Sequence, residues 1–170
     1  GALPTYYALA DAVAFAASKS MISLYNAAGS GKLVVLKKLH LINLQLAAVT
    51  GVAVRQDLRR FSAVHSAGTL VTPVSNDTAN AAIPAGITVR TGATITQGSL
   101  LFPLTFANDE VGATQAFPSV QLQAGINWLP EGSEVQGVRL REGEGINVQN
   151  ITSTTVGSFA YMFVFTLDDL

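Results

Sequence analysis

The sequence lacks cysteine altogether in its 170 residues. Disulfides, thiolate metal sites and cysteine nucleophiles are therefore excluded, while the compartment in which the protein works stays open. It also lacks any run that approaches the roughly 18 consecutive apolar residues of a membrane-spanning helix. Residues 8–17 are interrupted by Asp11 and have no basic flank of the kind that precedes a signal peptide. We therefore expect no membrane partner.

Charge is scarce as well. Asp, Glu, Lys and Arg make up 12% of the chain, about half of the roughly 25% found in an average soluble domain. The net charge is -1, and Lys and Arg are scattered apart from the pairs Lys37-Lys38 and Arg59-Arg60. This distribution argues against a nucleic-acid partner. Low charge suggests that other subunits cover part of the surface; the alternative is that small residues such as alanine inflate the apolar fraction.

A complete phosphate-binding loop is also absent. Residues 26–33 read NAAGSGKL and resemble the motif G-x-x-x-x-G-K-[ST], but the first glycine position falls on Asn26 and the Ser or Thr position on Leu33. The residues that follow alternate and are rich in β-branched side chains, which favours a strand over the helix that the motif requires. We predict a glycine-rich hairpin turn that binds no nucleotide.

Histidine occurs only twice, and neither position suggests catalysis. His40 lies between Leu39 and Leu41 in a predicted strand, and His65 lies in a turn. Neither belongs to a metal-ligand spacing, and the chain has no G-x-S-x-G nucleophile motif. We therefore predict that the protein is not an enzyme and has no catalytic residue. A hydrolase site assembled in space by distant residues is the alternative, which mutation of both histidines would test.

Paired carboxylates occur at Glu142 and Glu144, at Asp109-Glu110 and at Asp168-Asp169. Such pairs in glycine-containing turns can ligate calcium. None of them fits an EF-hand or a nonapeptide repeat, so solvated carboxylates are the simpler interpretation. We predict no metal ion and no other cofactor.

What the chain does contain is a series of short segments rich in Val, Ile, Leu, Thr and Phe, separated by Gly, Pro, Asn and Ser. This pattern is typical of β-strands and turns. The predicted strands are residues 20–25, 33–46, 52–62, 70–74, 87–90, 100–106, 119–122, 137–140, 146–151 and 158–167. Strands at this spacing, without intervening helices, predict an all-β, antiparallel jelly-roll-like β-sandwich.

The pattern divides the chain into an N-terminal arm, residues 1–18, and a single β-sandwich domain, residues 19–170. Within the arm the apolar residues fit a helix and a strand equally well, so its conformation stays open. The arm carries Tyr6, Tyr7, Leu9, Val13 and Phe15 and little charge. Exposed to water, these side chains would favour non-specific association. We expect the arm to contact a neighbouring subunit or the surface to which the subunits bind.

Residues 158–167 read SFAYMFVFTL. In a strand, Phe159, Tyr161, Phe163 and Phe165 would lie on one face and Ala160, Met162 and Val164 on the other. Both faces are apolar, whereas one face of a sandwich strand is normally polar. We expect one face in the core and the other against a symmetry-related copy; the alternative is that the arm of the same chain covers it.

A resemblance to a known family adds to this interpretation. The runs SLYNAAGSGKLVVLKKLHLINLQLAAVTGV, LRRFSA, VRLREGEGINVQN and TTVGSFAYMFVF resemble small β-sandwich proteins of the virions of tailed bacteriophages. The resemblance covers residues 20–166 and rests on turn motifs. It implies a capsid decoration (cement) protein that forms a homotrimer with a jelly-roll fold and binds the major capsid protein on the capsid exterior. The alternative is a tail-fibre or receptor/glycan-binding jelly-roll module, in which Trp128 would stack on a sugar ring rather than anchor the core.

Overall fold

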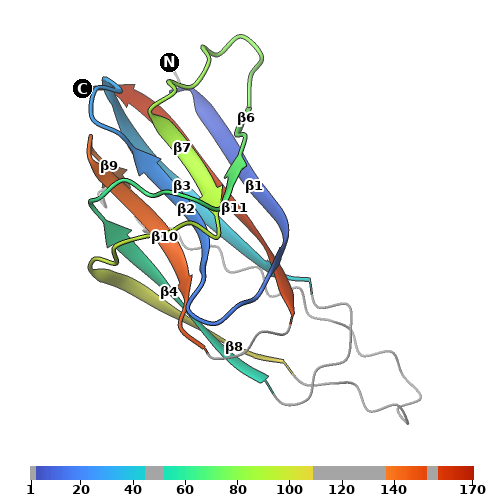
Figure 1. Ribbon diagram of the computed structural model, residues 1–170. Helices are drawn as coiled ribbons and strands as arrows, with labels where there is room; N and C mark the ends of the chain where they lie inside the picture. The colour runs from blue at the N-terminus through green and yellow to red at the C-terminus, as the bar shows by residue number, and fades with distance from the viewer. Residues whose placement is uncertain (1–2, 45–51, 109–136, 153–156) are drawn as a thin grey trace.

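The computed structural model describes residues 3–44, 52–108, 137–152 and 157–170, which form two packed antiparallel β-sheets (Figure 1). The strands are β1 (Thr5–Ala14), β2 (Ser20–Asn26), β3 (Lys32–Asn43), β4 (Val52–Phe61), β5 (Thr69–Val71), β6 (Val74–Ser75), β7 (Ile87–Thr91), β8 (Leu100–Asn108), β9 (Val138–Leu140), β10 (Glu144–Asn150) and β11 (Ser158–Asp169). No helix occurs among the described residues.

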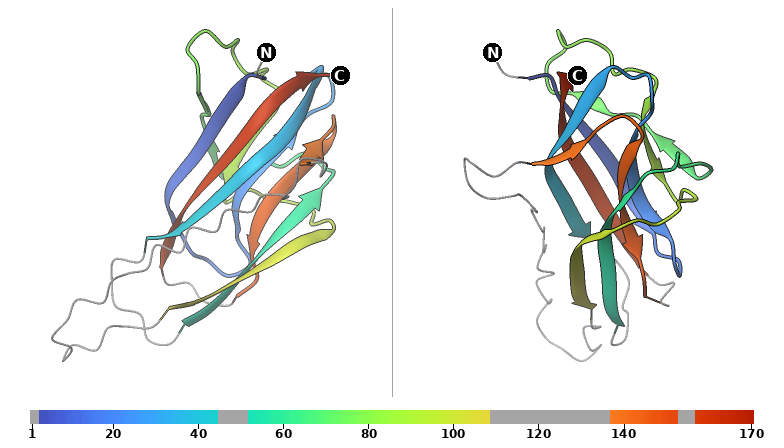
Figure 2. Two further views of the ribbon diagram at one scale, coloured as in Figure 1. Left: turned by 180° about the vertical axis from the view of Figure 1, so that it is seen from behind. Right: turned by 90° about the vertical axis from the view of Figure 1, so that its left-hand side faces the viewer.

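The strand order gives the sandwich its jelly-roll topology. One sheet has the order β6-β1-β11-β3-β9 and the other the order β5-β7-β2-β10-β4-β8 (Figure 2). The pairs β1 with β11, β2 with β10, β3 with β9 and β4 with β8 are nested in the sequence and alternate between the two sheets. This is the winding of an eight-stranded jelly roll, to which β5, β6 and β7 are added between β4 and β8. The predicted fold is confirmed.

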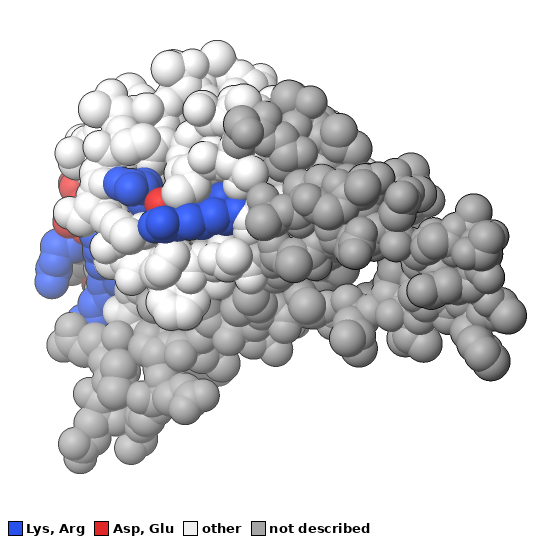
Figure 3. Space-filling view, turned by 90° about the horizontal axis from the view of Figure 1, so that it is seen from below, with Lys and Arg blue, Asp and Glu red and all other residues white. Residues whose placement is uncertain are grey.

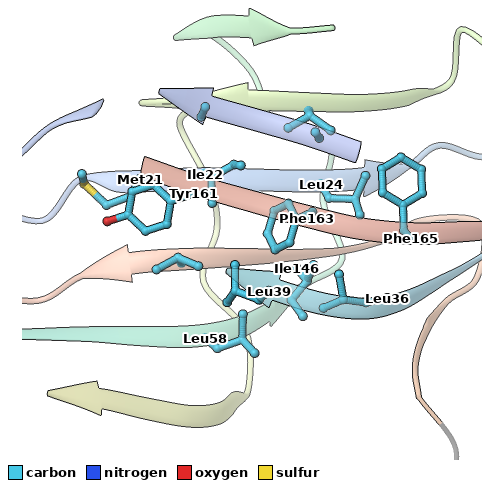
Figure 4. Packing of buried hydrophobic residues seen from close by; sticks show 14 of the residues in the cluster. Met21, Ile22, Leu24, Leu36, Leu39, Leu58, Ile146, Tyr161, Phe163 and Phe165 are labelled. Carbon is cyan, nitrogen blue, oxygen red and sulfur yellow. The ribbon is translucent and has the colours of Figure 1, made fainter. Parts of the chain in front are cut away.

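The core lies between the sheets and is dominated by one face of β11. Phe159, Tyr161, Phe163 and Phe165 are fully buried, as expected from their alternation along the strand. They pack against aliphatic side chains of both sheets, among them Leu24 (Figure 4). Burial of a large apolar side chain stabilises the fold by about 1.5–3 kcal/mol, so this stripe holds the two sheets together.

The predicted arm forms a strand of the sandwich. Residues 5–14 are β1, which pairs with β11 from Thr5 opposite Thr166 to Ala14 opposite Ser158. The expectation that residues 1–18 stand apart from the sandwich is therefore wrong for the part that forms β1. The local pattern could not decide this, because the free edge of β11 that receives β1 lies some 150 residues away along the chain.

The other predicted strands agree with the structure, with differences of a few residues at their ends. The exception is the strand predicted at residues 70–74, which is two short strands, β5 and β6, in different sheets. Pro73 lies between them, and proline supplies no N–H to a strand ladder. The strand predicted at residues 119–122 lies outside the described residues.

Candidate assembly surface

The side of the five-stranded sheet that faces away from the core carries a continuous apolar patch. Tyr7 pairs with Val74 on one side and Val164 on the other, and Leu9 pairs with Met162. Paired residues of antiparallel strands project to the same face of the sheet. These side chains therefore form a patch across β6, β1 and β11, which we call the outer patch: Tyr7, Leu9, Val74, Met162 and Val164.

The outer patch is accessible to a partner. Leu9 is 54% exposed and Val74 66% exposed, while Tyr7, Met162 and Val164 are half-buried. A sandwich sheet that faces water normally alternates apolar with polar residues. The outer side of the five-stranded sheet does not alternate in this way, because its middle part is apolar.

Charged and polar residues border the outer patch. Lys38 and His40 of β3 pair with Val164 and Met162 on one side, and the exposed Asp11 lies further along β1 on the other. An apolar centre with a polar border is the usual composition of a protein–protein interface.

Three of the six interface candidates from the sequence meet in the outer patch: Tyr7, Met162 and Val164. Ala160 is only 5% exposed. Tyr6 and Phe15 are wrong as interface residues, because they are 3% and 4% exposed and belong to the core. Their rings lie 5.9 Å from Phe165 and 4.6 Å from Phe159, respectively, between ring centroids.

The arm does not cover the second face of β11 either. β1 lies beside β11 in the same sheet, joined to it edge to edge. The alternative in which the arm of the same chain packs over the Met162 and Val164 side chains is therefore wrong for residues 5–14. Leu9 was expected among the apolar contact residues of the arm, whereas sequence reasoning missed Val74, because its contribution depends on the order of β6, β1 and β11.

His65 belongs to a separate polar cluster against the six-stranded sheet. Its Nδ1 lies 2.7 Å from Oγ of Ser23 and its Nε2 lies 2.7 Å from Oγ1 of Thr88. The ring also contacts the rings of Tyr25 and Phe61, with centroids 5.7 and 5.8 Å away. Both ring nitrogens are therefore engaged by hydroxyl groups.

Burial, and to a smaller extent the charge of Arg90, lower the pKa of His65 to about 4. The imidazole is therefore neutral at pH 7. Ser23 is fully buried and His65 is 3% exposed, so a substrate has no access to the pair. The arrangement fits a structural role in which the hydrogen bonds of His65 hold its loop against β2 and β7. Local sequence patterns do not indicate this contact, because Ser23 and His65 are 42 residues apart.

A buried ionic group lies on β4. Asp57 is fully buried and accepts hydrogen bonds from Nε of Arg55 at 2.9 Å and Nη2 of Arg59 at 3.4 Å. The carboxylate is thus shared between two guanidinium groups. In the view of Figure 3, Lys and Arg side chains form separate groups with uncharged residues between them.

The glycine-rich loop is a turn, but it joins strands of different sheets, so the predicted hairpin is wrong. Gly29 and Gly31 have φ of 84° and 69°, a region that favours glycine. The Gly31 N–H donates to Oε1 of Glu142 at 2.7 Å, and Nζ of Lys32 forms an ion pair with Asp169. Carboxylates therefore occupy the donors that a phosphate would need.

Two of the other candidate carboxylates accept hydrogen bonds from backbone N–H groups. Glu144 Oε2 accepts from the Arg141 N–H, and Asp168 Oδ1 from the Asp169 N–H. Across residues 3–44, 52–108, 137–152 and 157–170, no three or more His, Asp or Glu side chains gather in a group that could hold a metal ion. Asp109, Glu110 and Trp128 lie outside this part of the chain.

Comparison with known proteins gives no relative: no protein-family model, curated protein or solved structure matches the chain. Within the described part of the chain, no helix is long and apolar enough to cross a membrane.

Proposed function

We propose that this protein is a structural subunit that works by binding other subunits through the outer patch. In its specific form, the proposal is a bacteriophage capsid decoration protein, a homotrimer that binds the major capsid protein on the capsid exterior and stabilises the head. The observation that carries the proposal is the apolar outer side of the five-stranded sheet, centred on Met162 and Val164.

The physical argument starts from the cost of leaving this surface in water. Leu, Val and Met side chains each gain about 1.5–3 kcal/mol on complete burial, and Leu9 and Val74 are more than half exposed. A partner that covers the patch recovers this free energy. The low overall charge of 12% fits a chain that buries surface permanently in an assembly.

The buried polar clusters also support a binding role. His65, Ser23 and Asp57 are buried and engaged with neighbouring side chains. A catalytic group must reach its substrate, and these groups do not. The described residues therefore favour binding over turnover.

Two measurements test the proposal. Light scattering of the purified protein at micromolar concentration should give the mass of a homo-oligomer, three chains in the specific form. Electron microscopy of heads from the phage whose genome encodes the chain, with and without added protein, should show density on the capsid exterior. A monomer that adds no density to these heads would contradict the proposal.

A further inference from the structure

Strand β1 has one edge that is paired along its length and another that is mostly open. β11 pairs with β1 from Thr5 to Ala14, whereas β6 pairs with it only at Tyr6 and Tyr7. From Ala8 onward, no described strand pairs with this second edge, although β5 lies near it. An open strand edge presents unpaired N–H and C=O groups and is a template for another strand.

The backbone hydrogen bonds show which groups are open. The N–H of Leu167 donates to the carbonyl oxygen of Pro4 at 3.1 Å, so Pro4 and every second residue after it direct their backbone groups toward β11. The residues between them point the other way: the Thr5 carbonyl accepts from the Asn76 N–H at 2.9 Å, and Tyr7 pairs with Val74. Leu9 is next in this series and has no such partner among the described residues.

A β-bulge ends the open stretch on its far side. Between Ala10 and Val13 the register with β11 shifts, so that Asp11 and Ala12 together oppose Ala160. Ala12 has a φ of 51°, which bends the strand away from an ideal ladder. The open stretch is therefore short, bounded by Tyr7 and by the bulge, with Leu9 at its centre.

The surroundings of this stretch suit a strand. A groove of about 480 Å³ runs along it, with Leu9, Asp11 and Ala14 on one wall and Thr69–Thr72 on the other. Leu9 and Leu70, which line the groove, are 54% and 60% exposed. Backbone donors, backbone acceptors and apolar side chains are thus available together.

We infer that a second copy of this chain pairs its own β1 with this edge, antiparallel and around a two-fold axis near Leu9. In that register the Leu9 residues of the two copies lie opposite each other, and the open N–H of each meets the open C=O of the other. Identical edges are complementary under a two-fold axis, because residue i meets residue j and j meets i. Leu9 also belongs to the outer patch, so the edge contact continues the surface proposed above for self-association.

This inference rests on the proposed assembly role but is separable from it. The resemblance predicts a threefold contact, whereas the β1 edge gives a twofold contact. A chain that uses only the edge forms a dimer, and one that uses both contacts forms a hexamer with dihedral symmetry.

The test is Leu9→Pro, with Leu9→Ala as the matched control. The Leu9 N–H makes no bond to β11, so proline there removes only the open donor, as on natural edge strands. Light scattering should show that the wild type contains an even number of chains. Leu9→Pro should have half the mass with unchanged circular dichroism, and Leu9→Ala, which keeps the N–H, should stay associated. A trimer unaffected by Leu9→Pro would overturn the inference and leave the proposed function standing, whereas a monomer at every concentration overturns both.

Hydrogen exchange of the wild type tests the inferred β1 pairing even if Leu9→Pro fails to fold. The Ala8 and Ala10 amides face β11 and should be protected at all concentrations. The Leu9 amide should become protected only as the protein associates, by at least about tenfold in rate. A Leu9 amide that exchanges freely in the associated protein overturns the inference.

Discussion

Tyr161 of β11 donates its hydroxyl hydrogen to Oε1 of Gln56 on β4, and the two fully buried side chains join the two sheets through the core. Burial raises the pKa of the Tyr161 hydroxyl well above its ordinary value, so it remains a donor. Gln56 Nε2 has no hydrogen-bond partner among the described residues. This polar bridge through the core is therefore only partly satisfied.

Replacement of Tyr161 by phenylalanine should lower the free energy of unfolding by about 1–2 kcal/mol, because Gln56 Oε1 loses its donor. Adding Gln56→Leu should recover part of this loss, since the unpaired amide is then removed as well. Urea denaturation of the single and double variants measures both values. A double variant less stable than Tyr161→Phe alone would contradict the explanation.

Gly145 should not tolerate a side chain. A β-carbon at this position would overlap the ring of Phe61, which stacks on Tyr25. Gly145→Ala should therefore cost about 1–3 kcal/mol of stability by overpacking. In a Phe61→Leu background the same change should cost less, and a double-mutant cycle by thermal or urea unfolding measures the difference. Equal losses in both backgrounds would show that the ring is not the cause.

Stability should fall at acid pH because of His65. Its pKa is about 4 in the folded protein, below the ordinary value of 6.5, so the unfolded chain binds the proton first. The stabilisation is complete above pH 6.5 and is lost as the pH falls toward 4. His65 should contribute about 2 kcal/mol to the free energy of unfolding. This value is smaller than the full pKa shift implies, because solvent screens part of the effect.

The control for this prediction is His65→Gln, which cannot titrate. The free energy of unfolding at pH 7.5 and pH 4.5 should differ less for this variant than for the wild type. An identical pH dependence in the two proteins would remove His65 as the source.

Val164→Asp should disrupt the oligomer while the subunit stays folded. An unpaired charge buried in an interface costs several kcal/mol, which corresponds to at least a 100-fold weaker association. Ile151→Asp is the matched control, because Ile151 is 45% exposed and lies outside the outer patch. Light scattering across a dilution series compares the two variants, and equal effects would exclude the outer patch as the interface.

The loop at residues 26–33 should bind no nucleotide. The Gly31 N–H is bonded to Glu142, and Lys32 is paired with Asp169, so a phosphate would meet two carboxylates. Calorimetric titration with ATP and magnesium should give no saturable heat. Saturable binding that is lost in Lys32→Ala would reverse this conclusion.

Many strands and turns of this protein could be predicted from the local sequence alone. Alternation of side chains is a property of neighbouring residues, so the segment around Phe163 showed both that it is a strand and that both of its faces are apolar. The turns at Gly29 and Gly31 were likewise visible, because positive φ is largely restricted to glycine.

Which strands are neighbours could not be predicted from local patterns and depends on the packing of the whole chain. Because Tyr6 pairs with Phe165, the predicted arm contains a strand of the sandwich, and Tyr6 and Phe15 lie in the core. The contact between Ser23 and His65, and the addition of Leu9 and Val74 to the outer patch, also depend on the order of strands. Backbone hydrogen bonds between strands do not depend on which side chains the strands carry. Local patterns therefore predict that a strand exists and which of its faces is apolar, while the packing of the whole chain selects its partner.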